Sequence, residues 1–285
     1  MIERRPIADA VGHATLLLAM LIVAFPIYLA IIAASHTIQD LSSFPMPLLP
    51  GAELFKNTAQ ALFEGPQIAG VARATPALLL MLNSLIMAVS IAVGKIIISL
   101  LSAFAIVYFR FPLKNFFFWM IFITLMLPVE VRIIPTYKIV ADLGLLDTYT
   151  GLVLPLIASA TATFLFRQFF MTVPDELVEA ARIDGAGPMR FFWDVLVPLT
   201  RTSIAAMFVI QFIYGWNQYL WPLLIASDNR YQTIVLAIGR LVRSTDAFYE
   251  WPVIMGMAVL ALLPPVLVVV LMQRWFIKGL VETEK

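Results

Sequence analysis

Residues 174–198 read PDELVEAARIDGAGPMRFFWDVLVP, and they form the longest polar interruption in an otherwise strongly apolar sequence. The acidic residues that follow Pro174 suit the positive end of a helix dipole, so a helix is predicted to start there. Asp184 and Gly185 predict its end, because glycine adopts the left-handed C-cap conformation without steric cost. Pro188 then starts a second helix. The stretch therefore predicts two short helices joined by a tight glycine turn.

The second of these helices is apolar on nearly every side. A short helix covered in aromatic side chains cannot face water all round, so it must pack between two partners. At the edge of a membrane protein, the expected pair is the membrane domain and a docked cytoplasmic subunit. The apolar residues are Met189, Phe191, Phe192, Trp193, Val195 and Leu196.

The composition is that of an integral membrane protein. Of the 285 residues, 61% are hydrophobic and 13% are charged, whereas soluble domains carry roughly 25% charged residues. The mean hydropathy is +0.92. A net charge of +1 gives no electrostatic footprint for nucleic acid. Cysteine is absent, which excludes disulfides and thiol chemistry.

Hydropathy predicts an all-α membrane protein with six transmembrane helices in a single domain over residues 1–285. Six spans place both termini on one side of the membrane. Lysine and arginine are more numerous on that side than on the other, which predicts cytoplasmic N- and C-termini. The predicted spans cover about 13–35, 83–108, 115–135, 151–170, 201–225 and 252–277. The third is expected to be broken near its far end by Pro128.

Two of the connecting segments are distinctive. Residues 36–82 are rich in proline and glycine, and we expect them to form the first periplasmic segment, with an amphipathic patch near 54–63. Residues 171–200 lie on the same side as the termini. They are therefore expected to form a cytoplasmic loop that another protein can reach.

The sequence offers no catalytic constellation. Gly94-Lys95 is followed by Ile96 inside a predicted span, which departs from the phosphate-binding pattern GxxxxGK[S/T]. ATP would therefore be hydrolysed by another polypeptide. The two histidines, His13 and His36, fall near opposite ends of the first span and predict neither a metal site nor a nucleophile pair.

The spacing of Glu-Ala-Ala at 179–181, Gly185 and Leu-x-Pro at 196–198 resembles the EAA loop of bacterial ABC importer permeases. In that family, the loop inserts into a cleft on the ATP-hydrolysing subunit. The resemblance implies that Glu179 meets the ATPase and that the two alanines allow close approach. The residues implied in coupling are Glu179, Ala180, Ala181, Asp184, Gly185, Phe191, Phe192, Leu196 and Pro198.

Similarity to the carbohydrate-uptake family of maltose-type inner-membrane permeases extends along nearly the whole chain, and most of all to its sn-glycerol 3-phosphate branch. It implies the type I importer fold in the bacterial inner membrane. The implied partners are a second related permease, two ATPase subunits and a periplasmic binding protein. The cargo would be sn-glycerol 3-phosphate or its phosphodiesters. No cofactor is expected in this chain, because ATP and Mg²⁺ would bind the ATPase. The matching motifs lie at 83–85, 126–132, 160–170 and 215–222.

Two cations are candidates for the substrate path. Lys95 lies near the middle of the second span, where charges usually face a protein interior or a water-filled cavity. The alternative is a lysine that fixes helix packing. Arg132 lies near the outer end of the third span and could bind a phosphate through paired hydrogen bonds. The alternative is an interfacial anchor or an ion pair with Glu130.

A polar and aromatic cluster in the fifth span is the third candidate for the substrate path. Amide side chains hydrogen-bond polyol hydroxyls while aromatic rings shape the cavity. An aromatic belt with interhelical amide bonds is the alternative. The cluster comprises Tyr214, Trp216, Asn217, Gln218, Tyr219 and Trp221, of which the first four are the substrate-path candidates.

Two rival functions remain open at this point. The same architecture could import a sugar or an oligosaccharide. A secondary transporter, which needs no ATP, would require buried carboxylates for proton relay, and the acidic residues here fall almost wholly in loops.

Overall fold

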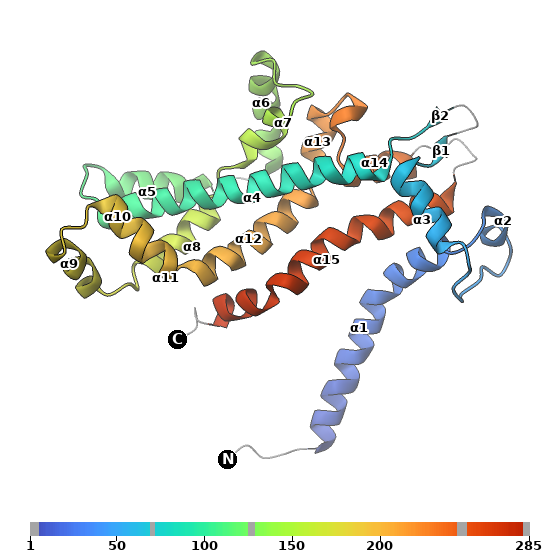
Figure 1. The fold of residues 1–285 in the computed structure, drawn as a ribbon, viewed down its shortest axis with the longest axis horizontal. Helices are drawn as coiled ribbons and strands as arrows, with labels where there is room; N and C mark the ends of the chain where they lie inside the picture. The colour runs from blue at the N-terminus through green and yellow to red at the C-terminus, as the bar shows by residue number, and fades with distance from the viewer. Residues whose placement is uncertain (1–5, 69–71, 125–128, 244–249, 282–285) are drawn as a thin grey trace. The chain divides into compact units, whose positions relative to one another are not determined.

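The computed structural model describes residues 6–68, 72–124, 129–243 and 250–281 (Figure 1). The chain is mostly helical and divides into two compact units. The first unit comprises Met1–Leu79 and Ala237–Leu263, and the second comprises Leu80–Leu236 and Pro264–Lys285.

In the first unit, helix α3 (Leu54–Phe63) connects the end of the first span to the start of the last one. Asn57 donates its side-chain amide to the carbonyl oxygens of Ala34 and His36, each at 2.9 Å. Gln60 donates to a carboxylate oxygen of Glu250 at 2.7 Å. The elements, some continuing into the second unit, are α1 (Pro6–Ala34), α2 (Ile38–Leu41), α3 (Leu54–Phe63), β1 (Gln67–Ile68), β2 (Ala72–Arg73), α14 (Ile234–Arg243) and α15 (Trp251–Val281).

The segment after the first span is more structured than predicted. Helix α3 coincides with the amphipathic patch predicted at 54–63, and the two short strands form an antiparallel hairpin. The chain is therefore mostly helical rather than wholly α. The periplasmic position of residues 36–82 stays a prediction.

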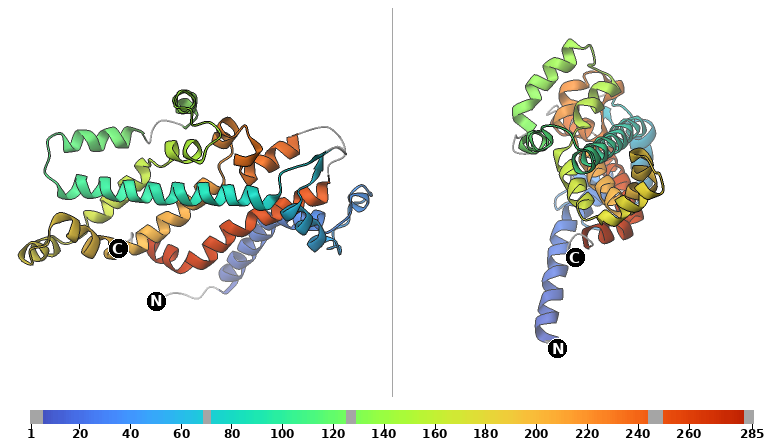
Figure 2. Two further views of the ribbon diagram at one scale, coloured as in Figure 1. Left: turned by 45° about the horizontal axis from the view of Figure 1, so that its top comes forward. Right: turned by 90° about the vertical axis from the view of Figure 1, so that its left-hand side faces the viewer.

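In the second unit, the long helix α4 (Ala77–Tyr108) is the central element, and its first turn begins in the first unit. Figure 2 shows α5 running back alongside it. The remaining elements up to residue 231 are α5 (Lys114–Ile123), α6 (Val129–Asp142), α7 (Tyr149–Val153), η2 (Leu154–Leu156), α8 (Ala160–Phe170), α9 (Asp175–Ile183), α10 (Pro188–Phe191), η3 (Phe192–Leu196), α11 (Val197–Leu199), α12 (Arg201–Trp216), α13 (Leu220–Ile225) and η4 (Asn229–Tyr231).

Glycines let the helices of the second unit approach closely. A Cβ on Gly215 of α12 would lie 2.8 Å from the Cα of Ala88 on α4. A Cβ on Gly94 would lie 2.7 Å from a methyl group of Ile157. These separations are too short for real carbon atoms, so glycine at both positions is a packing requirement.

The six predicted spans do not all appear as continuous helices. In the described residues, three helices are long and apolar enough to cross a membrane, and up to five spans result if each of two bent pairs is counted as one. The count of six and the cytoplasmic termini therefore stay predictions. The three long spans are Ala10–Ala34, Ala77–Tyr108 and Trp251–Trp275.

The predicted fourth and fifth spans are each interrupted, and the third is described only in two parts. The third consists of α5 and α6, and the predicted break at Pro128 lies outside the described residues. The fourth bends by 48° between η2 and α8. The fifth ends at Trp216 and resumes at Leu220. Pro222 lacks the amide hydrogen that would bond the carbonyl of Gln218 in a continuous helix, which explains the break in the fifth span. The break in the fourth span lies after Pro155, where Ser159 caps the start of α8.

Candidate functional site

The polar stretch folds as two short helices around a glycine turn, which confirms the prediction. Helix α9 starts after Pro174, and Asp184 is its C-cap. Gly185 has a φ of +71°, the left-handed conformation that glycine adopts most readily. The amide of Ala186 then donates to the carbonyl oxygen of Ala181 at 2.8 Å, which closes the helix end. We call the segment from α9 to α11 the coupling segment.

The second helix of the coupling segment changes character before its proline. Helix α10 continues into a π-helical turn, η3, in which the amide of Val197 donates to the carbonyl of Phe192. Pro198 cannot donate an amide to the carbonyl of Asp194, so the wider turn fits directly before it. The chain then bends by 74° into α12. This bend gives the coupling segment its direction relative to the span.

One face of the second helix is buried in the second unit. Phe192 is 2% exposed, and its ring lies 5.0 Å from that of Phe104 on α4. Phe191 meets Tyr108 edge to face at 5.4 Å. The buried cluster joins α4, α8, α12 and the coupling segment, and it consists of Ile96, Leu100, Ala103, Phe104, Ala162, Phe166, Phe170, Phe191, Phe192, Leu196 and Met207.

The opposite face of the same helix is open. Trp193 is 60% exposed and Met189 is also exposed, although both are large and apolar. Pro198 is exposed as well. The prediction of one membrane-domain partner is therefore confirmed, whereas the second partner stays a prediction.

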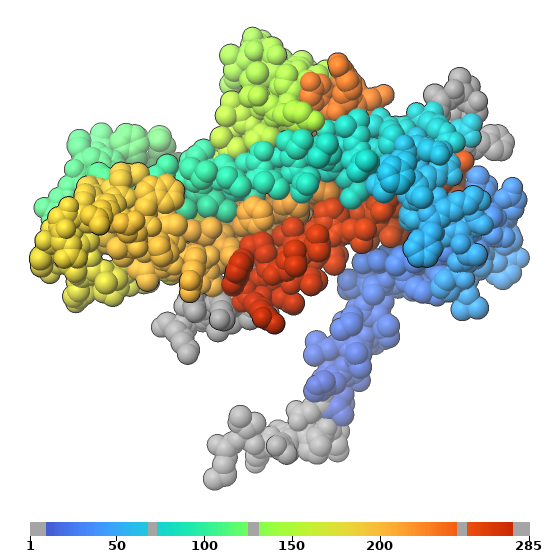
Figure 3. All heavy atoms as spheres, viewed as in Figure 1, coloured from blue at the N-terminus to red at the C-terminus, as the bar shows by residue number. Residues whose placement is uncertain are grey.

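Helix α9 has no buried residue. Glu179, Ala180 and Asp184 are exposed, and Ile183 is 85% exposed. In Figure 3 the residues of α9 and α10 lie beside the end of α4. Leu177 is exposed as well, so the helix presents a short polar surface with two large apolar side chains that is available for docking.

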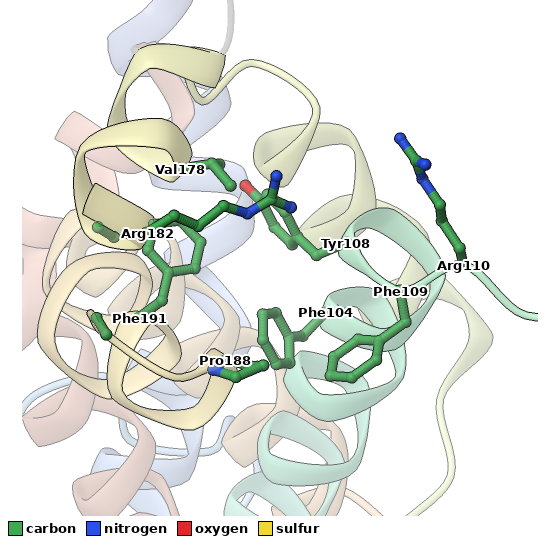
Figure 4. A pocket seen from close by; sticks show the side chains of 10 residues that line it. Phe104, Tyr108, Phe109, Arg110, Val178, Arg182, Pro188 and Phe191 are labelled. Atoms are coloured by element: carbon green, nitrogen blue, oxygen red, sulfur yellow. The ribbon is translucent and has the colours of Figure 1, made fainter. Parts of the chain in front are cut away.

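A cavity of about 280 Å³ lies between the coupling segment and the end of α4. Figure 4 shows aromatic rings from α4 facing Val178 and Arg182 of α9 across it. Ala181 also lines the cavity and is half-buried. The cavity leaves α9 less tightly packed on the unit than α10 is.

A second cavity, of about 360 Å³, lies at the other end of α12 and brings together four of the substrate-path candidates. Arg132 approaches it from α6 and forms no ion pair with a side chain that the structure describes. The predicted alternative, an ion pair with Glu130, falls on a side chain outside those described. The amide of Gln218 donates to the carbonyl of Tyr214 at 3.2 Å. The lining residues are Arg132, Ile133, Thr136, Pro155, Leu156, Tyr214, Asn217, Gln218, Tyr219, Leu220 and Trp221.

Lys95 does not line this second cavity. Its side chain is 6% exposed and donates to the side-chain oxygen of Gln211 at 3.0 Å. The ammonium also lies 3.6 Å from the centre of the Tyr214 ring, and that ring lines the cavity. Lys95 is therefore linked to the cavity through Tyr214.

Trp216 does not line the cavity either. Its side chain is 2% exposed, and its ring stacks on Phe212 at 5.9 Å. Phe212 stacks in turn on Phe208 at 6.1 Å. Trp216 thus belongs to the packed interior of α12, although its neighbours in sequence line the cavity.

Hydrogen bonds between loops hold the cavity wall. The indole of Trp221 donates to the carbonyl of Gly151 at 3.2 Å, and the amide of Asp228 donates to Asp147 at 2.7 Å. Arg230 donates to the carboxylate of Asp228 at 2.7 Å, and this contact lowers the pKa of that carboxyl. The first contact joins α13 to α7, the second joins the chain after α13 to the chain before α7, and the third lies within one loop.

Gln211 is the site residue that the sequence did not reveal. It is buried in α12 and its amide oxygen accepts the hydrogen bond from Lys95. The available signal was a glutamine inside an apolar span, because such a side chain needs a partner within the protein. Among the described residues, no group of three or more metal-ligating side chains occurs.

Residues 95–282 match the family model of the binding-protein-dependent transport system inner membrane component. The chain belongs to this family. It is a multi-pass inner-membrane permease, as the apolar helices also indicate. The coupling segment and the residues that line both cavities lie within the matched residues.

Curated relatives match this permease over their full length. It is 60% identical to the sn-glycerol-3-phosphate transport system permease protein UgpE of Rhizobium meliloti (strain 1021), over 100% of each chain. The proteins of the same name from Agrobacterium fabrum (strain C58 / ATCC 33970) and Yersinia pestis bv. Antiqua (strain Antiqua) are 61% and 57% identical, also over 100% of each chain.

A solved structure shares the fold of this permease. It is a chain of a bacterial ABC transporter involved in the import of the acidic polysaccharide alginate. The TM-score is 0.82, with 20% sequence identity over 97% of this chain and 99% of that chain. The arrangement of helices is therefore that of an ABC transporter chain.

Proposed function

We propose that this chain is a transmembrane permease subunit of an ATP-driven importer for sn-glycerol 3-phosphate. Relatives at 57–61% identity over the full length carry that cargo in their names. Glycerophosphodiesters, which keep the same glycerol phosphate group, are a related cargo.

The single observation that carries the cargo assignment is the cavity around Arg132. A guanidinium that lines a cavity can bind a phosphate through two parallel hydrogen bonds. The amides of Asn217 and Gln218 line the same cavity and suit glycerol hydroxyls. A cation beside neutral amides fits a small phosphorylated polyol.

The coupling segment supports a mechanism without covalent chemistry in this chain. ATP would be bound and hydrolysed with Mg²⁺ by a partner pair of subunits, which would move the coupling segment as they close. Since Phe191 and Phe192 are packed against α4, that motion would rock the spans between inward- and outward-facing states. The proposed topology has six spans with both termini in the cytoplasm.

In the complete transporter this chain would have three kinds of protein partner, and it would lie in the lipid bilayer. The protein partners are a second, related permease, the two ATPase subunits and a periplasmic binding protein. The exposed Trp193 and the polar surface of α9 form the proposed contact with an ATPase subunit. A sugar remains the second candidate cargo, because amide and aromatic side chains also suit sugar hydroxyls.

Uptake by the reconstituted complex tests this proposal. The permease pair, ATPase and binding protein are placed in vesicles, and uptake of labelled sn-glycerol 3-phosphate is compared with that of a disaccharide. We expect ATP-dependent uptake of the phosphate compound only. Uptake of the sugar alone would assign the second cargo, and uptake driven by a proton gradient without ATP would contradict the importer mechanism.

A further inference from the structure

Lys95 is a buried cation that the proposed cargo does not touch. It lies 13 residues before the end of α4 at Tyr108, which is roughly 20 Å along the helix. The side chain is 6% exposed in this chain alone. Neither a cargo nor a partner subunit can therefore reach the ammonium without displacing its present neighbours.

The contacts that Lys95 makes with the described side chains do not compensate its charge. An ammonium has three donors, and here it has one neutral acceptor, the amide oxygen of Gln211, and one ring face, that of Tyr214. Among the described residues, it makes no ion pair with a carboxylate. A methionine would fill a similar volume without this desolvation penalty, so packing alone does not explain the lysine.

The charge is connected to the cavity by one side chain. Tyr214 has its ring face 3.6 Å from the Lys95 ammonium and also lines the cavity that contains Arg132. A cation on a phenol ring draws electron density from it, and hydrogen bonds that follow one another polarise each other in a low dielectric. The hydroxyl of Tyr214 becomes a stronger donor as a result.

We propose that Lys95 is a positioning residue for cargo charge: its ammonium strengthens the hydrogen bond that the Tyr214 hydroxyl donates to a phosphate in the cavity. This inference rests on the proposed function. It adds that the cavity favours the doubly charged phosphate monoester over a singly charged phosphodiester. At pH 7.5 the monoester is mostly a dianion, because its second pKa is about 6.

The test compares two cargoes in the reconstituted complex at pH 7.5. Uptake kcat/KM is measured for sn-glycerol 3-phosphate and for a glycerophosphodiester, and their ratio is the readout. Since the same binding protein delivers cargo to every variant, its own preference cancels when ratios are compared. We expect Lys95→Met to lower the ratio about three- to tenfold. The variant removes one positive charge, and the two cargoes differ by one negative charge. Lys95→Arg should restore most of it.

The route through Tyr214 is tested by combining variants. Tyr214→Phe keeps the ring under the ammonium but removes the hydroxyl, so it should lower the ratio by itself. Adding Lys95→Met to Tyr214→Phe should then change the ratio less than about twofold, as interacting residues are not additive. If Lys95→Met prevents assembly, Lys95→Gln can replace it, because glutamine keeps a hydrogen-bond donor for Gln211. Lys95→Gln should lower the ratio of kcat/KM values by the same factor.

Two results overturn the inference while the proposed function stands. One is an unchanged ratio in the neutral Lys95 variants, including the case in which both cargoes slow equally, as a purely structural role predicts. The other is an undiminished effect of Lys95→Met in the Tyr214→Phe background. If the unaltered complex imports neither phosphate compound, the proposed cargo itself is wrong, and the inference falls with it.

Discussion

At the residue scale, the backbone of the coupling segment is set by a few local requirements. Gly185 has a positive φ, and a Cβ placed there would meet nothing within 4 Å. Glycine is therefore required at position 185 for its backbone conformation and not for lack of space. This could be predicted from Asp184-Gly185 because the signal is local. The bond between Lys95 and Gln211 could not, since the two residues are 116 positions apart.

Alanine at Gly185 should destabilise the isolated permease by about 1 kcal/mol, because L-residues are strained in the left-handed region. The matched controls are two other glycines with open space around them. Gly144→Ala, at a φ of +67°, should cost a similar amount, and Gly187→Ala, at −69°, should cost little. Thermal unfolding in detergent measures all three. Equal effects of Gly185→Ala and Gly187→Ala would contradict this explanation.

Arg132 should contribute to transport through the geometry of its guanidinium as well as its charge. Arg132→Gln should lower uptake kcat/KM for sn-glycerol 3-phosphate by roughly tenfold or more, as a charge-assisted pair is lost. Arg132→Lys should restore only part of it, since an ammonium cannot form the paired contact. Labelled uptake measures both variants. If Arg132→Gln retains full uptake, Arg132 is an interfacial anchor.

At the element scale, the sequence located the spans better than their interruptions. Hydropathy is an average over a long window, so the fourth and fifth spans were predicted as continuous. The actual breaks depend on single residues such as Ser159, which caps the start of α8, and Pro222, whose missing amide stops a helix. The close approach of α12 at Gly215 depends on Ala88 of another helix, so it could not be predicted from the sequence either.

Neighbouring aromatics of the coupling segment should separate folding from docking. Phe192 is buried against Phe104, and Phe192→Ala should destabilise the permease by about 3 kcal/mol. Trp193 is 60% exposed, so Trp193→Ala should leave stability almost unchanged but weaken ATPase binding by about tenfold or more. Thermal unfolding and a pull-down titration of the ATPase measure the two effects. Tight ATPase binding by Trp193→Ala would place the docking surface elsewhere.

At the scale of the whole molecule, one helix connects the two sites of the second unit. Helix α12 starts beside the coupling segment and ends at the cavity that contains Arg132. Its 16 residues span roughly 24 Å, most of the hydrocarbon thickness of a membrane. The EAA-like spacing and the polar cluster were both visible in the sequence. Their connection through a single rigid element became clear only from the fold.

The central claim is that the coupling segment transmits ATP hydrolysis to the spans. The direct measurement is the ATPase activity of the assembled complex in lipid, with and without loaded binding protein, for the unaltered chain, Gly185→Asp and Gly144→Asp. The account predicts that loaded binding protein stimulates the unaltered complex and Gly144→Asp, whereas Gly185→Asp assembles but is not stimulated. Normal stimulation of an intact Gly185→Asp complex would show that residues 174–198 are only a connection between spans.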